Sequence, residues 1–361
     1  AVYSGKYARE LRSTARELVK PGKGILACDE STGTVGKRIE SVGLVNSEES
    51  RQMWRNLLFN APGIGKYISG AILFEETLFQ DAPSGKPFVK VLRSNGVIPG
   101  IKVDTGLKPL VGGAKGETWC TGLDTLAERA AMYYKQGARF AKWRTALRIS
   151  PVDGCPTELA IETACRDLAR YARICQENGL VPIVEPEILL DGTHDIETCA
   201  ALQERVLTCV YSRMAECGVL LEGSLLKPSM SVPGVGCKDK SDPATIAATT
   251  VRTLSRCVPP TVPGITFLSG GISEEDASIY LNEINKLEER SALPATLTFS
   301  FSRALQSSCI KTWGGTEENY AAAQQQLLAR AQANSEASLG QYVPGSQPSL
   351  EESLFVKDYV Y

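Results

Sequence analysis

Apolar segments that end in a charged or hydroxyl-bearing residue recur along the whole sequence, with amphipathic stretches between them. We count eight such segments and expect each of them to form a strand: residues 24–31, 69–76, 100–104, 140–144, 180–187, 220–228, 264–271 and 297–303. Apolar strands that alternate with helices are typical of a (β/α)8 TIM barrel. In such a barrel the active site lies at the C-terminal ends of the strands, where these polar residues stand.

Helical spacing of apolar residues is clearest in five stretches. They cover residues 5–19, 123–136, 158–178, 196–217 and 316–337. Asp242-Pro243 and Ser273 mark two further helix starts, the second with a capping-box pattern. We therefore expect a single α/β barrel domain over residues 1–337, opened by an N-terminal helix.

Residues 338–361 lose this periodicity and are rich in Gly, Pro, Ser and Gln. This composition predicts a flexible C-terminal tail. The tail nevertheless ends in aromatic residues, Tyr359 and Tyr361, which indicates that it docks against another part of the protein.

Composition excludes several classes of function. The net charge of −2 provides no broad basic surface for nucleic acid or anionic lipid, and no apolar run is long enough to span a membrane. Eleven cysteines without a CxxC pair are typical of buried thiols in a reducing compartment. His194 is the only histidine, so one chain cannot form a metal site with two or three histidines. Its polar surroundings predict a solvated loop position.

Charged pairs at strand spacing end three of the segments: Lys102/Asp104, Lys142/Arg144 and Glu185/Glu187. Residues i and i+2 of a strand point to the same side, so these pairs would converge inside the barrel. Buried charges are costly unless they are paired or used. A salt-bridge network that only holds the barrel together is the alternative to a catalytic site.

Lys227 ends a long apolar segment and precedes Pro228. A lysine is ordinarily protonated at pH 7 and is then not nucleophilic. Desolvation and a neighbouring cation such as Lys142 would favour the neutral amine, which attacks a carbonyl and forms a Schiff base. Glu185 and Glu187 can move protons during imine formation, and Asp29 can act as base toward a substrate hydroxyl. Taken alone, Lys227 is better explained as a salt-bridged lysine.

Two regions are candidates for binding phosphate. Ser269-Gly270-Gly271 and Arg303 follow the seventh and eighth segments, where barrels of this kind usually bind phosphate. The loop after the first segment offers a second basic site, and its candidate residues are Ser31, Thr34, Lys37 and Arg38. Its glycines do not have P-loop spacing.

Taken together, these motifs resemble one family from about residue 5 to the last residue. The matching stretches read GILACDESTGTVGKR, ILFEETL, PGIKVDTG, GARFAKWR, GLVPIVEPEILLDG, LLEGSLLKPSM, FLSGG and TFSFSRALQ. They closely resemble class I fructose-1,6-bisphosphate aldolases. These are metal-independent lyases that cleave the sugar bisphosphate into dihydroxyacetone phosphate and glyceraldehyde 3-phosphate.

The resemblance implies a role for each catalytic candidate. Lys227 matches the Schiff-base lysine, Glu187 the carboxylate that assists carbinolamine dehydration, and Glu185 the proton-transfer acid and base. Asp29 matches the group that orients and deprotonates the substrate hydroxyl, and Lys142 stabilises developing charge. Tyr361 matches a C-terminal tyrosine that helps proton exchange on the enamine, and the resemblance implies that the tail folds over the barrel mouth and reaches the active site.

The resemblance also divides the phosphate-binding residues. Lys102, Arg144, Ser31 and Thr34 match positions near the 6-phosphate, whereas Ser269, Gly270 and Arg303 match the 1-phosphate pocket, to which we add Gly271 and Ser302. The chain departs from the family pattern at three positions. Ser302 stands where many relatives have glycine or alanine, Thr105 where lysine is common, and Cys28 where alanine or methionine is usual.

Further expectations follow from the same resemblance. They are a homotetramer, phosphorylated sugars as substrates, no cofactor, and no nucleic-acid or membrane partner. The compartment is expected to be the cytoplasm, or alternatively a plastid after removal of a transit peptide. Glycolysis, gluconeogenesis and plastid carbon metabolism all remain open.

Two other classes of function are alternatives to an aldolase. A pyridoxal-phosphate barrel enzyme would also join a lysine to an aldehyde. A non-catalytic scaffold, for example for a cytoskeletal protein, would need none of the paired acids.

Overall fold

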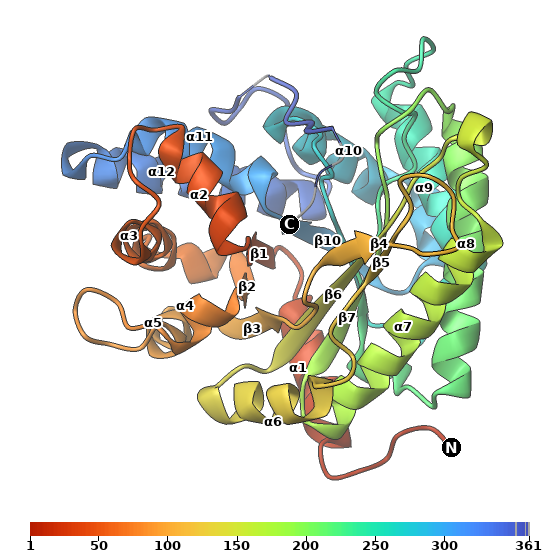
Figure 1. Ribbon diagram of the computed structural model, residues 1–361. Helices are drawn as coiled ribbons and strands as arrows, with labels where there is room; N and C mark the ends of the chain where they lie inside the picture. The colour runs from red at the N-terminus through yellow and green to blue at the C-terminus, as the bar shows by residue number, and fades with distance from the viewer. Residues whose placement is uncertain (351, 358, 360–361) are drawn as a thin grey trace.

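The computed structural model describes residues 1–350, 352–357 and 359. Eight parallel strands close into a barrel in the order β1-β10-β9-β8-β7-β6-β3-β2 (Figure 1). Their bounds are β1 Gly24–Cys28, β2 Ile68–Leu73, β3 Ile98–Lys102, β6 Phe140–Leu147, β7 Val181–Ile188, β8 Leu225–Leu226, β9 Gly264–Phe267 and β10 Thr296–Phe301. Each strand lies within or overlaps one of the eight apolar segments, so the prediction of a (β/α)8 barrel is confirmed.

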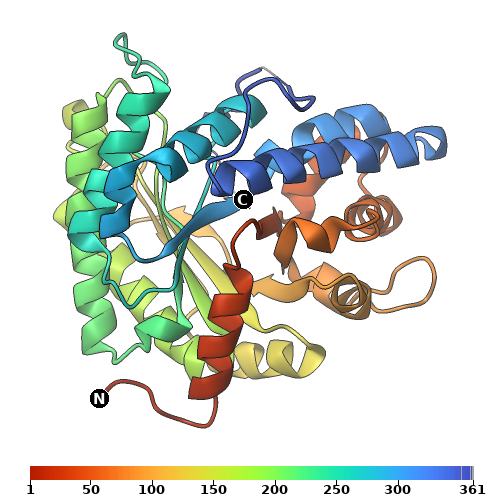
Figure 2. The same cartoon turned by 180° about the vertical axis from the view of Figure 1, so that it is seen from behind.

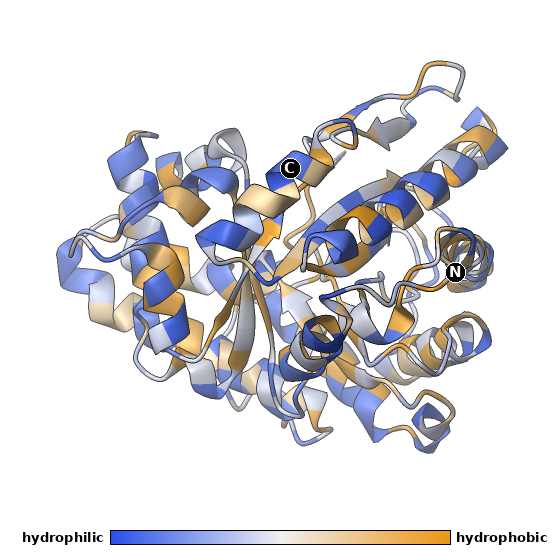
Figure 3. Ribbon diagram, turned by 90° about the horizontal axis from the view of Figure 1, so that it is seen from below, coloured by the Kyte–Doolittle hydropathy of each residue, from blue (hydrophilic) through white to orange (hydrophobic). Residues whose placement is uncertain are grey.

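Helices surround the barrel. Their bounds are α1 Ala8–Leu18, α2 Thr32–Glu40, α3 Glu48–Phe59, α4 Glu75–Phe79, α5 Phe88–Ser94, α6 Leu126–Gln136, α7 Glu158–Glu177, α8 Ile196–Glu216, α9 Pro243–Cys257, α10 Glu274–Lys286, α11 Arg303–Trp313 and α12 Tyr320–Ser338. Apolar residues gather along the strands and on the helix sides that face them, and polar residues face outward (Figure 3). A short antiparallel hairpin, β4 Leu107–Pro109 and β5 Thr118–Cys120, follows β3.

One end of the barrel is filled with apolar side chains. α1 packs its buried Leu11, Ala15 and Leu18 against the strand starts (Figure 2). The Phe140 ring occupies the interior so closely that a Cβ on Gly100 would lie 2.3 Å from it, which explains the glycine. Because this end is sealed, the charged side chains of the strands lie toward the other end.

Three expectations about local structure are wrong. The candidate phosphate loop after β1 is largely helical, because the Ser31 hydroxyl accepts a hydrogen bond from Thr34 N at 3.3 Å and starts α2. The long strand expected over residues 220–228 is reduced to β8, which has two residues and follows the 3-10 turn η3, Leu221–Gly223.

His194 is not a solvated loop residue, since only 8% of its surface is exposed. Its ring packs against the backbone of Gly192 and Gly234, whose absent side chains leave room for it. Burial lowers the pKa of His194 and keeps the ring neutral.

The described part of the tail returns to the polar end of the barrel after α12. Leu354 N donates to Gly271 O at 3.0 Å, and the Tyr359 ring lies 4.2 Å from the guanidinium of Arg303. These contacts hold the described end of the tail against the loop after β9 and the first residue of α11. Among the described residues, no helix combines the length and apolar character needed to cross a membrane.

Candidate active site

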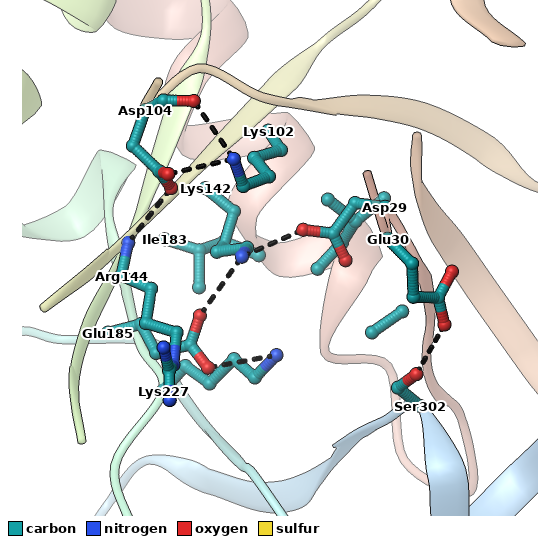
Figure 4. A network of polar contacts seen from close by, with 12 residues as sticks. Asp29, Glu30, Lys102, Asp104, Lys142, Arg144, Ile183, Glu185, Lys227 and Ser302 are labelled. Atoms are coloured by element: carbon teal, nitrogen blue, oxygen red, sulfur yellow. Dashed lines mark hydrogen bonds and ion pairs between the residues drawn. The ribbon is translucent and has the colours of Figure 1, made fainter. Parts of the chain in front are cut away.

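Charged side chains enter the barrel from the ends of neighbouring strands. Arg144 on β6 pairs in register with Glu185 on β7, and Lys102 on β3 pairs with Lys142. Because side chains alternate along a strand, Lys142 and Arg144 share the inward side with Phe140. Five of the six charged residues anticipated from the sequence gather in one space, namely Lys102, Asp104, Lys142, Arg144 and Glu185 (Figure 4), and Glu187 joins them through its ion pair with Arg144.

Lys142 lies at the centre of this space and is only 1% exposed. Its Nζ is 2.7 Å from Asp29 Oδ2 and 3.4 Å from Glu185 Oε2. A buried ammonium group requires such partners, because desolvation without them costs several kcal/mol. Lys142 thereby joins the carboxylates of β1 and β7.

Lys227 follows β8 directly and is 3% exposed. Its Nζ lies 3.3 Å from Glu185 Oε1, and its backbone N–H donates to Val184 O at 2.8 Å. Glu185 consequently stands between two lysines and has one oxygen near each. This arrangement places an amine and a proton acceptor in contact within a site from which water is largely excluded.

Glu187 and Asp104 pair with the remaining cations. Glu187 forms an ion pair with the Nε of Arg144. Asp104 is 2.9 Å from the Nζ of Lys102 and accepts a hydrogen bond from Arg144 N at 3.3 Å. Burial would raise the pKa of Asp104, but Lys102 and Lys142 outweigh burial and lower it.

Two acidic residues follow β1 and face different partners. For Asp29, burial is again outweighed by Lys142, Lys227 and Lys102, so its pKa is lowered and it is an anion at neutral pH. Glu30 points the other way, toward Arg38 at 2.6 Å and Arg55 at 3.0 Å. Burial opposes the ionisation of Glu30 too, yet both arginines lower its pKa.

One small cavity combines the candidate amine with part of the predicted 1-phosphate set. Its lining includes Lys227, Glu187, Ser269, Gly270 and Arg303. The N-terminus of α11 begins at this cavity, and such a terminus presents unpaired N–H groups to an anion. Gly271 does not line this cavity, because it faces the tail.

Ser302 also lines that cavity, but its hydroxyl has another partner. It donates to Glu30 Oε1 at 2.6 Å and accepts from Arg38 Nη1 at 3.3 Å. A serine at a helix N-cap ordinarily accepts from the first turn, and Ser302 makes no such bond to α11. The hydroxyl therefore adds a hydrogen bond to Glu30 and does not cap the first turn of α11, where Leu305 N and Gln306 N donate to the Ser302 carbonyl oxygen, both at 3.0 Å.

The other phosphate candidates are distributed over two further cavities. Thr34, Lys37 and Arg38 line one together with Arg303 and the tail, whereas Ser31 caps α2 outside it. Lys102 and Arg144 line the other, beside Asp104.

Two further positions singled out in the sequence lie elsewhere. The hydroxyl groups of Thr105 and Thr121 form a hydrogen bond of 2.8 Å. Tyr361 lies outside the described residues.

Sequence reasoning missed two residues of this site. The Ser300 hydroxyl is buried, lines the Lys227 cavity and has no hydrogen-bond partner among the described residues. The alternation of Thr298 and Ser300 with apolar residues in β10 could have revealed it. Glu30 is the second missed residue. It follows Asp29 in the same motif, and only the folded structure shows its contacts with Arg38 and Arg55. The described residues contain no group of three or more His, Cys, Asp or Glu side chains able to hold a metal ion.

Comparison with known proteins gives a consistent answer. The family described as fructose-bisphosphate aldolase class-I matches residues 10–361. Fructose-bisphosphate aldolase 1 of Toxoplasma gondii is 55% identical over 99% of this chain and 98% of the relative. The cytoplasmic isozyme of Spinacia oleracea is 56% identical over 99% of both chains, and the chloroplastic aldolase 2 of Arabidopsis thaliana is 53% identical over 99% of this chain and 88% of the relative.

A solved structure also matches the whole fold. It is the fructose-bisphosphate aldolase of Plasmodium falciparum, determined in complex with TRAP and a small-molecule inhibitor. It is 52% identical, covers 96% of this chain and 98% of its own, and superposes with a TM-score of 0.92. Matches of this extent and identity leave one conclusion: the chain belongs to the class-I fructose-bisphosphate aldolase family and is a lyase.

Proposed function

We propose that the protein catalyses the reversible retro-aldol cleavage of fructose 1,6-bisphosphate through a Schiff base on Lys227. The observation that carries this proposal is the contact of 3.3 Å between Lys227 Nζ and Glu185 Oε1 in a buried site. An amine of this kind becomes nucleophilic when it transfers its proton to the adjacent carboxylate. Dihydroxyacetone phosphate and glyceraldehyde 3-phosphate are the products.

Imine formation comes first. The neutral Lys227 amine adds to the C2 ketone, whose oxygen takes up the proton that Glu185 received from the ammonium group. Glu185 then accepts a proton from the nitrogen, which leaves a neutral carbinolamine. Glu187 then relays this proton from Glu185 to the carbinolamine hydroxyl, which leaves as water, and the nitrogen lone pair forms the iminium. Arg144 keeps Glu187 beside the cavity that Lys227 lines.

Carbon–carbon cleavage follows. Asp29 accepts the proton of the C4 hydroxyl, the C3–C4 bond breaks, and its electron pair moves into the iminium to give an enamine. Its lowered pKa and its contact with Lys142 keep Asp29 ionised, as a base must be before it reacts. Lys142 stabilises the developing charge. Tyr361 helps to return a proton to C3, and hydrolysis of the resulting imine releases the second product.

Binding of the two phosphates fixes the sugar in place. We assign the 1-phosphate to the α11 N-terminus with Ser269, Gly270, Ser302 and Arg303, and with Gly271 behind this loop. We add Ser300 to this set, because its buried hydroxyl has no hydrogen-bond partner among the described residues. We assign the 6-phosphate to Lys102 and Arg144, with the α2 residues Ser31, Thr34, Lys37 and Arg38 as its second basic region.

Assembly and location are part of the same proposal. Family membership supports a homotetramer, which sedimentation velocity would test. Relatives named cytosolic and chloroplastic are nearly equally similar, so we propose the cytoplasm and keep the plastid as the alternative. Fluorescent tagging of the full-length gene product would decide between the two compartments. The pathway that the enzyme serves follows from the compartment.

Borohydride trapping tests the catalytic proposal. With dihydroxyacetone phosphate present, hydride reduces the iminium to a stable secondary amine, and we expect complete loss of activity and one modified peptide carrying Lys227. The Lys227→Met variant should give no adduct. The control variant Lys20→Met, in an exposed ion pair with Glu17, should label fully. An adduct on any other lysine would overturn the assignment.

A further inference from the structure

The carboxylate of Glu274 joins three segments that are distant in sequence. Glu274 begins α10 and is fully buried. Its Oε1 accepts a hydrogen bond from Ser308 N of α11 at 2.8 Å, and its Oε2 accepts one from Leu350 N of the tail at 2.8 Å. A single side chain thus fixes the tail against the two helices that follow β9 and β10.

Neighbouring residues hold the preceding stretch of tail in the same place. Glu275 accepts hydrogen bonds from the Tyr342 hydroxyl and from Gly345 N, both at 2.8 Å. Arg330, buried on α12, donates to Pro348 O at 3.3 Å and to Glu274 O at 2.8 Å. We call Glu274, Glu275 and Arg330 the tail clamp. Among the described residues, Leu350 is the last tail residue that forms a hydrogen bond with the clamp.

The tail clamp is continuous with the candidate 1-phosphate loop. Ser269 and Gly270 line the Lys227 cavity, Ser273 caps α10, and Glu274 follows at once. Beyond the clamp the tail bonds back to this loop, through Leu354 N to Gly271 O at 3.0 Å, and Arg303 donates to Leu354 O. A shift of Leu350 would therefore be transmitted to the segment that approaches the cavity.

We propose that the tail clamp, with Glu274 at its centre, positions the end of the chain for catalysis by fixing the point from which residues after Leu350 extend. The inference rests on the role proposed for Tyr361. Glu274 does not touch the cavity that Lys227 lines, so it acts as a positioning residue. Its buried carboxylate has the acceptor oxygens that two backbone N–H groups on different segments require.

Glu274→Gln in the full-length chain is the primary test, because the amide keeps the shape but turns N–H donors toward one of the two backbone donors. Hydrogen exchange should become faster in tail peptides that span residues 343–357 and stay unchanged in α7 and α8. With fructose 1,6-bisphosphate, kcat should fall by roughly threefold to tenfold with little change in KM. Glu283→Gln is the matched control, since Glu283 lies on the same helix and, among the described residues, pairs only with its neighbours Asn282 and Lys286.

A double-mutant cycle with Tyr361→Ala separates positioning from a general effect on the barrel. If Glu274 acts through the tail, the combined variant should lose no more activity than Tyr361→Ala alone. Additive losses, or unchanged tail exchange in Glu274→Gln, would overturn the inference even when borohydride still traps Lys227. Failure of that trapping would instead overturn the proposed function. Should Glu274→Gln not fold, Tyr342→Phe removes one bond to Glu275 and gives the same two readouts.

Discussion

Lys142 and Asp29 form an ion pair of 2.7 Å across the interior of the barrel. Their strands, β6 and β1, are not neighbours, since β1 lies between β10 and β2, and β6 lies between β3 and β7. The contact is therefore a bridge through the site rather than a pair along the sheet. Buried ion pairs seldom stabilise a fold more than apolar side chains of the same volume would. Their presence here is better explained by the chemistry of the site.

Removal of one partner of this ion pair should lower both the stability and the activity of the protein. In Lys142→Met the carboxylates of Asp29 and Glu185 lose their shared cation, and we expect the free energy of unfolding to fall by about 3–5 kcal/mol. Turnover should fall by roughly a hundredfold or more. The double variant with Asp29→Asn should regain part of the stability but none of the activity. Urea denaturation and steady-state kinetics measure both effects.

A surface pair provides the contrast for that experiment. Lys20→Met removes the exposed ion pair with Glu17 and should change stability by less than about 1 kcal/mol. If Lys142→Met were as stable and as active as this control, the central place given to Lys142 would be wrong.

Acid should unfold the protein through its buried carboxylates. Asp29, Glu30 and Asp104 all have pKa values below their ordinary range, because nearby cations outweigh burial. A depressed pKa contributes stability that is complete above the unfolded pKa of about 4 and is lost as the pH falls through the folded value. We expect the contribution of these three carboxylates to the unfolding free energy to be nearly constant from pH 7 to pH 5 and to fall steeply below pH 4. Glu30→Gln should make that fall shallower, and a curve of unchanged slope would contradict the assignment.

Several parts of this structure followed from the sequence because they depend on local pattern. The alternation of side chains along a strand, together with the apolar run before each site, predicted the strand ends that carry Lys142, Glu185 and Lys227. The position of Ser31 as a helix cap depends on a hydrogen bond that only the folded backbone reveals. The burial of His194 depends on Gly234, which lies far along the chain. Glu30 and Ser302 meet only after the barrel closes, so neither residue indicates the other in sequence.

Thiol reactivity should follow burial. Eight of the eleven cysteines are buried, and Cys209, Cys217 and Cys257 are partly exposed. Burial raises the pKa of Cys199 to about 11, and it also raises the pKa of Cys28 and Cys309, so these thiols stay protonated. Titration of the native protein with Ellman's reagent at pH 8 should modify at most three thiols quickly, and all eleven in denaturant. More than three fast thiols in the native protein would contradict the burial described here.

The hydroxyl of Ser302 gives the most specific prediction about this chain. It donates to Glu30, whose carboxylate also holds Arg38, and hydrogen bonds to a charged group contribute about 1.5–3 kcal/mol. Ser302→Ala should lower the free energy of unfolding by that amount and raise KM for fructose 1,6-bisphosphate more than it lowers kcat, because Arg38 and the start of α11 lose their connection. Ser302→Thr keeps the hydroxyl and should behave more like the unmodified protein. If alanine and threonine had the same effect, the loss of the hydroxyl could not be the cause, and the hydrogen bond to Glu30 would have no part in substrate binding.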